Sequence, residues 1–264
     1  MPLFLYDLPN WLVGMLISGG AVVLALTAYA VYRRFSGNEF DADERALAMS
    51  VLGVVATINS LLLAFSAVSV WESFGSAEEA VLNEGNTIGE LARDLAVFGG
   101  PESTRARTLL REYAMVVIDD EWDTMRTGGA NFVAWQTIDN MFRAVGTLEP
   151  DTPRKAALLP EIWARTNELL THRRDRLHAS QSEVPGTLWA VVFAGTLLTL
   201  LTTFVLPPTR FNLVMIAALA FCMGLVFYFI IAMDRPFAGE ESISPAPFQS
   251  AIDNMERWDR ESAD

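Results

Sequence analysis

The sequence predicts an all-α membrane protein with four transmembrane helices and a helical soluble domain inserted between the second and third spans. Four apolar blocks and a helical spacing of apolar residues between them support this fold class. Each block holds about 20 residues or more and contains no Asp, Glu, Lys, Arg or His: residues 11–32, 46–71, 187–206 and 211–233. About 20 apolar residues, rising 1.5 Å each, cross a hydrocarbon core of about 30 Å. We therefore expect each block to span a membrane.

The spans divide the chain into four segments. We expect an N-terminal transmembrane helix pair, a helical soluble domain, a C-terminal transmembrane helix pair and a soluble tail, at residues 1–71, 72–186, 187–233 and 234–264. The first block has no Lys or Arg before it and is longer than a signal peptide, so it is expected to remain as an anchor. Only Gly19–Gly20 suggests a break within that span.

The charges near the spans do not choose an orientation. An even number of spans on either side of residues 72–186 puts this segment and both termini on one side of the membrane. Positive charge close to the spans usually marks the cytoplasmic side. The short loops carry four arginines and the opposite side carries four: Arg33, Arg34, Arg45 and Arg210 against Arg173, Arg174, Arg176 and Arg235.

The segment between the second and third spans is expected to be helical throughout. Residues 74–98 continue the second span, and Gly99–Gly100–Pro101 breaks the chain before a helix that ends at Gly128 and Gly129. A further helix contains Trp135, and a long one covers about 154–181. The tail is expected to end in a short helix.

The composition argues against several classes of function. The chain has a net charge of −13, and nucleic acid or an anionic lipid surface would require clustered cations. The single cysteine, Cys222, excludes an intrachain disulfide. His172 and His178 are six residues apart, whereas a metal pair on a helix needs i, i+4 spacing. No catalytic residue, cofactor or metal site is predicted, and we do not expect an enzyme.

An acidic run could instead contact a hard cation. Its members are Asp119, Asp120, Glu121 and Asp123. Carboxylate oxygens are calcium ligands, but the run lacks the glycine-containing spacing of a calcium loop. A solvated acidic helix end is the favoured interpretation.

The second span carries the polar residues of greatest interest. At 100° per residue a nearly continuous stripe contains Asn59, Leu62, Ser66, Ser69 and Ser73. In an oligomer this stripe would line a pore, with Leu62 as an apolar constriction that Leu63 assists. Four glutamates follow where the pore mouth would be: Glu72, Glu78, Glu79 and Glu84. The alternative is that small residues let helices approach closely while serines bond to their own i−4 carbonyls.

Four stretches of the sequence resemble the bestrophin-like family of bacterial membrane proteins. They are "LLLAFSAVSVWESFGSAEEAVLNEGNTIGEL", "REYAMVVIDDEWDTM", "RRDRLHASQSEVPGTLW" and "MDRPFAGEESISPAPF", and they occur in the family's order over nearly the whole chain. The family is named for its similarity to bestrophins, which are pentameric ion channels whose second span lines the pore.

The resemblance implies a homo-oligomer, most simply a pentamer, in a bacterial inner membrane with the soluble domain in the cytoplasm. It does not imply calcium gating, because bestrophins have a dense acidic run after the last span and only Glu240 and Glu241 follow it here. The motif Asp234, Arg235, Pro236 and Phe237 lies where the last span ends. A structural role is favoured for it, with Asp234 or Arg235 pairing with Glu84 or Arg173.

Two functions remain compatible with the sequence. The first is an oligomeric ion channel, in which the pore-mouth glutamates favour cations and the partners are other copies of the chain, the lipid bilayer and the permeating ions. The second is a membrane-anchored scaffold or sensor that binds a protein partner and does not conduct.

Overall fold

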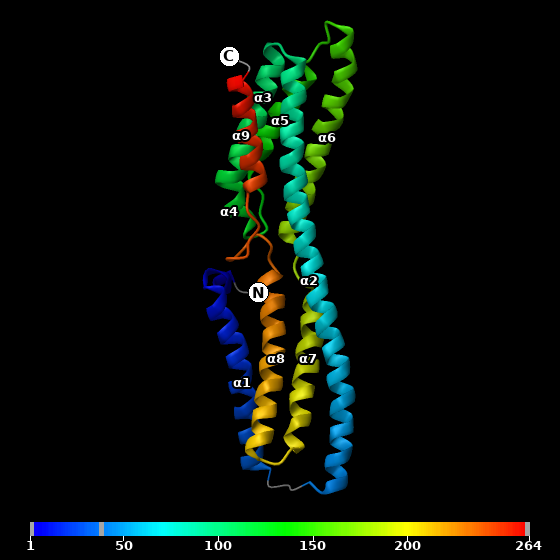
Figure 1. Cartoon of the computed structure of the whole chain (residues 1–264), viewed down its shortest axis with the longest axis vertical. Helices are drawn as coiled ribbons and strands as arrows, with labels where there is room; N and C mark the ends of the chain where they lie inside the picture. Colours follow the sequence, from blue (N-terminus) through cyan, green and yellow to red (C-terminus); the bar gives the residue numbers. More distant parts are fainter. Residues whose placement is uncertain (1–2, 37–39, 262–264) are drawn as a thin grey trace. The chain divides into compact units, whose positions relative to one another are not determined.

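The computed structural model describes residues 3–36 and 40–261. Within these residues the regular structure is entirely helical, as predicted (Figure 1). The elements in chain order are η1 (Leu3–Asp7), α1 (Asn10–Phe35), α2 (Ala42–Phe98), α3 (Pro101–Val116), η2 (Val117–Glu121), α4 (Trp122–Met125), α5 (Phe132–Gly146), α6 (Pro153–Gln181), α7 (Gly186–Thr202), η3 (Thr203–Val205), α8 (Arg210–Met233) and α9 (Ala246–Glu261).

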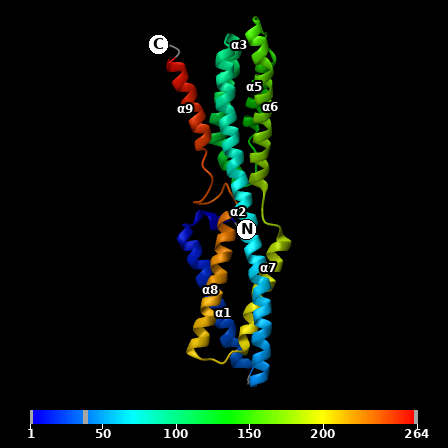
Figure 2. The same cartoon turned by 45° about the vertical axis from the view of Figure 1, so that its right-hand side comes forward.

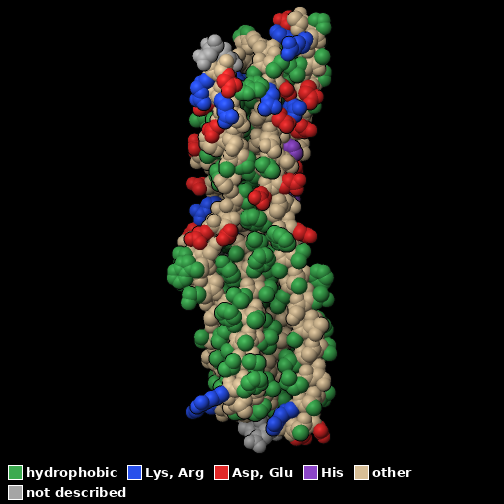
Figure 3. Space-filling model, in the orientation of Figure 1, with side chains coloured by type: hydrophobic (Ala, Val, Ile, Leu, Met, Phe, Trp, Pro, Cys, Tyr) green, Lys and Arg blue, Asp and Glu red, His purple; other side chains and the backbone are tan. Residues whose placement is uncertain are grey.

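Four helical segments are long and apolar enough to cross a membrane. They are α1, α2, the segment Pro153–Val205 that includes α7, and α8. Each contains one of the four apolar blocks predicted from the sequence, except that Leu206, the last residue of the third block, lies beyond the segment. On the face shown in Figure 3, the lower part of the molecule shows hydrophobic and uncharged surface, and charged side chains appear only at its two ends. The Gly19–Gly20 pair does not break the first span, because α1 continues through it.

The 57-residue helix α2 has clear start and stop signals. Asp41 and Glu44 form a reciprocal capping box, in which the Asp41 carboxylate accepts from the Glu44 N–H at 2.8 Å and the Glu44 carboxylate accepts from the Asp41 N–H at 3.0 Å. Gly99 and Gly100 have positive φ angles of 67° and 94° and end the helix, and Pro101 begins α3. The predicted continuation of the second span to residue 98 is thus confirmed.

The chain divides into two compact units. Unit 1 contains residues 1–72, 183–235 and 239–241, and unit 2 contains residues 73–182, 236–238 and 242–264. These limits differ slightly from the segments expected from the sequence. In particular, most of the tail belongs to the same unit as residues 73–182 and does not stand alone.

In unit 1, small residues bring α1 and α8 into close contact (Figure 2). A Cβ atom added to Gly224 would lie 2.6 Å from the Cα of Ser18, so the two backbones meet there without an intervening side chain. Nearer the loops, the Tyr29 hydroxyl donates to the Leu206 carbonyl at 2.7 Å. Close backbone approach through small residues is the usual basis of helix association in lipid.

In unit 2, one hydrophobic core joins α2, α3, α5, α6 and α9. Its largest apolar members are fully buried: Ile88, Leu91, Leu95, Leu110, Tyr113, Met125, Ile138, Met141, Ile162 and Phe248. Asn131 and Thr152 cap the N-termini of α5 and α6 with their side chains. Gly128, with a φ angle of 73°, ends the helical run after α4. The helices that form this core therefore begin and end at local signals, a capping side chain or a glycine with a positive φ angle.

One local irregularity was not predicted. Between α3 and α4 the segment η2 adopts π-helical geometry, which inserts an extra residue into the turn. Glu121, at the end of this segment, is buried with Val117 one turn earlier, while its neighbours Asp119 and Asp120 remain exposed. The acidic run is therefore only partly the solvated helix end that we expected, because one of its members enters the core.

Candidate functional site

The residues predicted to line a pore do not share one environment. Asn59, Leu63 and Ser66 are buried within the chain, with 1%, 5% and 2% of their surface exposed. Leu62 and Ser73 are half-buried, and Ser69 is exposed. The stripe is thus divided between a side that packs inside one chain and a side that is open to lipid, water or another copy.

The buried side of the stripe packs against α7 and α8. The Asn59 amide nitrogen donates to the Thr196 hydroxyl at 3.4 Å, and its oxygen fills the space above Gly195, where an added Cβ would lie 2.3 Å away. Leu63 packs with Val192 and Met223 in an apolar cluster. Ser66 donates to the Leu62 carbonyl four residues earlier, at 2.8 Å. These contacts match the helix-packing alternative for this half of the stripe.

Other polar residues of α2 lie on its uncovered surface. Thr57 and Ser60 are exposed within the apolar span, although they are not among the residues predicted to line a pore. The Thr57 hydroxyl donates to the Gly53 carbonyl at 2.7 Å, which satisfies its donor without a partner outside the helix. Their angular position around α2, measured from the buried face, would have identified them. The sequence alone does not show which face of α2 is buried.

The four glutamates predicted at the mouth also differ. Glu72, Glu78 and Glu79 are exposed, whereas Glu84 is fully buried. Glu79 lines a pocket of about 360 Å³ in unit 2, between α2 and α6. His172 and His178 both line this pocket, although their spacing suggested opposing faces. Among the described residues, however, no group of three or more His, Cys, Asp or Glu could hold a metal ion.

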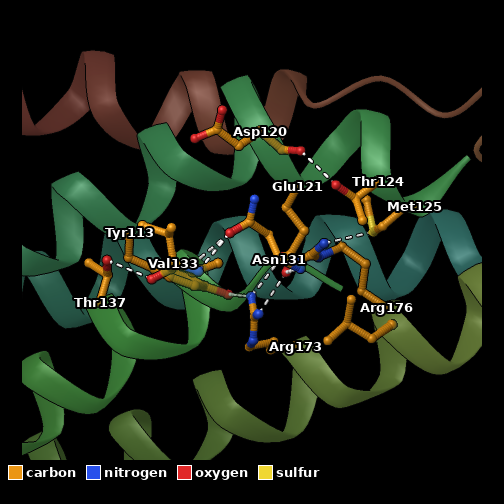
Figure 4. Close-up of polar contacts among 12 residues, drawn as sticks. Tyr113, Asp120, Glu121, Thr124, Met125, Asn131, Val133, Thr137, Arg173 and Arg176 are labelled. Atoms are coloured by element: carbon orange, nitrogen blue, oxygen red, sulfur yellow. Dashed lines mark hydrogen bonds and ion pairs between the residues drawn. The ribbon is translucent and has the colours of Figure 1, made fainter. Parts of the chain in front are cut away.

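Glu84 belongs to a buried cluster of charges in unit 2. Figure 4 shows three other members of this cluster, Glu121, Arg173 and Arg176. The cluster contains two acids and two bases: Glu84 on α2, Glu121 on η2, and Arg173 and Arg176 on α6. All four side chains are 0% exposed. Formal charges therefore balance inside the core, which is the condition under which buried ions are tolerated.

Nearly all hydrogen-bonding groups of the four charged side chains have partners; Arg173 Nε is the exception among them. Arg173 clasps Glu121 through two bonds of 2.7 Å, and Arg176 bonds Glu84 at 2.6 and 3.2 Å and Glu121 at 2.8 Å. The Tyr113 hydroxyl donates to Glu84 and accepts from Arg173. The backbone N–H of Asn131 donates to Glu121 at 3.0 Å. Residues of α2, α3, η2 and α6 and Asn131 before α5 are thereby tied together through charge-assisted hydrogen bonds.

Aromatic rings surround the two guanidinium groups. Arg173 lies over Trp135 at 4.6 Å from the ring centroid, and Arg176 lies over Phe248 at 5.4 Å. Trp122 packs edge-to-face against Phe237 of the motif that follows the last span. Each of the four stretches that carry the family resemblance therefore contributes to this one region. Their spacing along the chain gave no sign of it.

The pKa of Glu121 is lowered by its environment. Burial raises the pKa of this carboxyl, but the charge of Arg176 and the bonds from Arg173 outweigh burial and hold the pKa below its usual value. Folding therefore favours the ionised form. Its contribution to stability is fully present above the unfolded pKa of about 4.3 and is lost as the pH falls through the lower folded pKa.

This linkage gives a first prediction. The variant Glu121→Gln imitates a protonated carboxyl, so it should be less stable than the native protein at pH 7 and the difference should shrink as the pH falls below about 4. Thermal unfolding followed by circular dichroism at pH 7, 5, 4 and 3 measures the difference. A difference that stays constant over this range would contradict the proposed ionisation.

The motif after the last span has other partners than those suggested from the sequence. Asp234 accepts from the Val184 N–H at 2.8 Å, and Arg235 pairs with Glu183. Neither residue pairs with Glu84 or Arg173, which belong to the buried cluster. Burial raises the pKa of Asp234, while the bond from Val184 lowers it by less. The pairing is therefore corrected, although both residues do make structural contacts.

Apolar spanning helices and the absence of any strand in the described residues define the class as a helical, multi-span membrane protein. The bestrophin-like domain matches residues 19–248, and the chain belongs to the bestrophin-like family. A solved crystal structure described as that of a membrane protein has the same fold, with a TM-score of 0.68 and 12% identity over 95% of this chain and 98% of the other. No curated protein matches the chain.

Proposed function

We propose that the chain is one subunit of a homo-oligomeric ion channel in which α2 lines the conduction path. The observation that carries the proposal is the polar surface of α2 left uncovered within the chain. Exposed Thr57, Ser60 and Ser69 interrupt the apolar span of α2, with Ser69 beside Leu62 on one flank of the buried face and Ser60 on the other. Membership of the bestrophin-like family supports the same function by analogy.

The exposure of each residue indicates which of the predicted residues line the proposed pore. Leu62 is half-buried, whereas Leu63 is held in the packing between helices, so Leu62 is the proposed constriction. Exposed Glu72, Glu78 and Glu79 form the proposed mouth and favour cations. Glu84 is left out of the mouth because Arg176 neutralises it inside the core.

The remaining parts of the proposal come from the family. They are a pentamer of identical subunits, a bacterial inner membrane, and a cytoplasmic location for the helical domain between the second and third spans. No catalytic step, cofactor or metal belongs to the proposal.

Purified protein in planar bilayers tests the channel. We expect currents whose reversal potential in a salt gradient indicates cation preference. The triple variant Glu72→Gln, Glu78→Gln, Glu79→Gln should move this potential toward zero because the mouth loses its negative charge. Glu112→Gln removes one exposed glutamate elsewhere and is the matched control. A well-folded oligomer that never conducts would contradict the proposal.

Because Cys222 is the single cysteine of the chain, its replacement gives a cysteine-free background in which the lining residues can be tested one at a time. In a Cys222→Ser background, Leu62→Cys and Ser69→Cys should be modified by a water-soluble thiol reagent with a change in current. Asn59→Cys and Leu63→Cys should be protected, because both positions are buried within the chain. Modification of the buried pair alone would reverse the assignment of the lining face.

A non-conducting scaffold is the second candidate. The observation that favours it is the burial of Asn59 and Ser66 between helices of a single chain, which leaves half of the polar stripe without access to a pore. Silent bilayers and unreactive cysteines at both sets of positions are its expected results.

A further inference from the structure

A groove in unit 2 runs between α2 and α9. It consists of two adjoining pockets that share Gly89, Arg93, Ala251 and Asn254, and the first has a volume of about 350 Å³. It is distinct from the buried charge cluster and from the pocket that contains the histidines. None of the functions considered above uses it.

Two glycines of α2 create the groove. At Gly85 an added Cβ would lie 2.6 Å from Pro247, so the start of α9 packs directly on the α2 backbone there. At Gly89, one turn later, an added Cβ would meet nothing within 4 Å. Ala92 and Ala251 continue the floor with small side chains. The helices therefore touch at one end, and a space remains beside Gly89.

Arginines form the walls of this space. Arg93, Arg107 and Arg257 line the first pocket together with Glu261, Asn254 and Trp258. In a chain with a net charge of −13, the three guanidinium groups at this pocket outnumber the two carboxylates beside them, Glu261 in the lining and Asp259 paired with Arg107, so the local charge is positive. Anions would be repelled by most of this protein, but this pocket attracts them.

The donors of these arginines are partly unused. The Arg107 terminal nitrogens bond Asp259 and the Met255 carbonyl, but its Nε is buried and has no hydrogen-bond partner among the described residues. Arg93 lies over the ring of Trp258, with 5.1 Å to the centroid, which orients its guanidinium. Within the described part of the chain, neither Arg93 nor Arg257 has an ion pair with a carboxylate.

We propose that this groove binds a small phosphate-bearing anion. Planar guanidinium groups bind phosphate oxygens in pairs, and a floor of glycine and alanine admits a compact ligand close to the backbone. The Asn254 side chain adds a neutral donor at the edge. Nucleic acid does not fit, because it needs an extended basic surface and not a single pocket. The site lies within unit 2 and is independent of ion conduction.

Titration calorimetry with inorganic pyrophosphate and the full-length protein in detergent tests the site. We expect saturable binding that Arg93→Gln and Arg257→Gln each weaken about tenfold, as expected for the loss of one charge-assisted hydrogen bond. Arg154→Gln makes the same charge change at an exposed position of α6 outside the groove and should leave binding unchanged. Equal weakening by all three variants would reduce the effect to overall charge and overturn the proposal.

A steric variant tests the location independently of charge. Gly89→Leu should abolish binding by filling the open space, whereas Gly89→Ala should keep most of it and leave the fold intact, because alanine is favoured over glycine within a helix. If Gly89→Leu is folded and still binds pyrophosphate with native affinity, the ligand does not occupy the groove.

The phosphate could belong to a soluble molecule or to a lipid headgroup, and the same variants separate these sources. Protein in nanodiscs that contain phosphatidic acid is compared with protein in nanodiscs of phosphatidylcholine alone. Pyrophosphate binding that is sensitive to Arg93→Gln assigns a soluble ligand. If Arg93→Gln changes binding only in the nanodiscs that contain phosphatidic acid, the ligand is a lipid headgroup. Absence of groove-dependent binding in both arms overturns the proposal.

Discussion

Arg176→Met should lower the free energy of unfolding by about 3–5 kcal/mol, the cost of breaking a buried ion pair by removing one partner. Arg176 is 0% exposed and bonds both Glu84 and Glu121. Methionine has a similar length and no charge, so the packing volume is largely kept while the two carboxylates lose their shared partner. Chemical unfolding of the detergent-solubilised protein, followed by circular dichroism, measures the loss.

Two matched variants separate charge from packing. Arg174→Met changes an exposed arginine on the same helix and should shift stability by less than about 0.5 kcal/mol. Adding Glu84→Gln to Arg176→Met removes the uncompensated charge and should recover much of the loss. A double variant no more stable than Arg176→Met would show that the loss comes from packing.

The loss should also depend on pH. In Arg176→Met an unpaired buried glutamate is forced to raise its pKa, because the ionised form has lost its partner. Protonation at low pH then relieves the cost. The gap between Arg176→Met and the native protein should therefore narrow as the pH falls from 7 toward 4, whereas a packing defect would leave it constant.

Much of the helical framework was predictable because its signals are local. The four apolar blocks became spans, the break at Gly99–Gly100–Pro101 separates α2 from α3, and the expected helix over 154–181 is α6, which begins at Pro153. Each depends on residues that are neighbours in sequence: length of an apolar run, a capping side chain, a glycine with positive φ. Local physics was sufficient for these features.

The buried cluster was not predictable, because its order is not local. Glu84 and Arg176 are 92 residues apart, and Glu121 meets Arg173 and Arg176 only through the tertiary packing of η2 against α6. Charged residues are almost never fully buried unless paired, so an isolated sequence favours a solvated interpretation for each of them. The polar stripe met the same limit. Helical phase placed its members on nearly one face, but the structure divides them between buried and exposed positions, and Asn59 is buried against Gly195, a residue on another helix.

The close contact of α1 with α8 gives the second large prediction. Gly224→Leu should destabilise the protein by about 3 kcal/mol or more, since overpacking costs 1–3 kcal/mol even where only side chains must move. Here the obstacle is backbone, because the Cβ alone would lie 2.6 Å from the Ser18 Cα and 3.3 Å from the Ile17 carbonyl oxygen. No rotamer change can relieve that overlap, so α1 must move away from α8. The thermal unfolding midpoint in detergent should fall accordingly.

Gly20→Leu provides the control on the opposite surface. Gly20 lies in the same span as Ser18 and is exposed, and an added Cβ would meet nothing within 4 Å. Its replacement should be nearly neutral, because leucine is a better helix former than glycine and lipid accepts its side chain. Gly224→Ala should fall between the two leucine variants, since it adds the overlapping Cβ and no more. Equal midpoints for Gly224→Leu and Gly20→Leu would mean that α1 is not held against α8 by backbone contact. The remaining side-chain contacts of α1 would then have to position the first span.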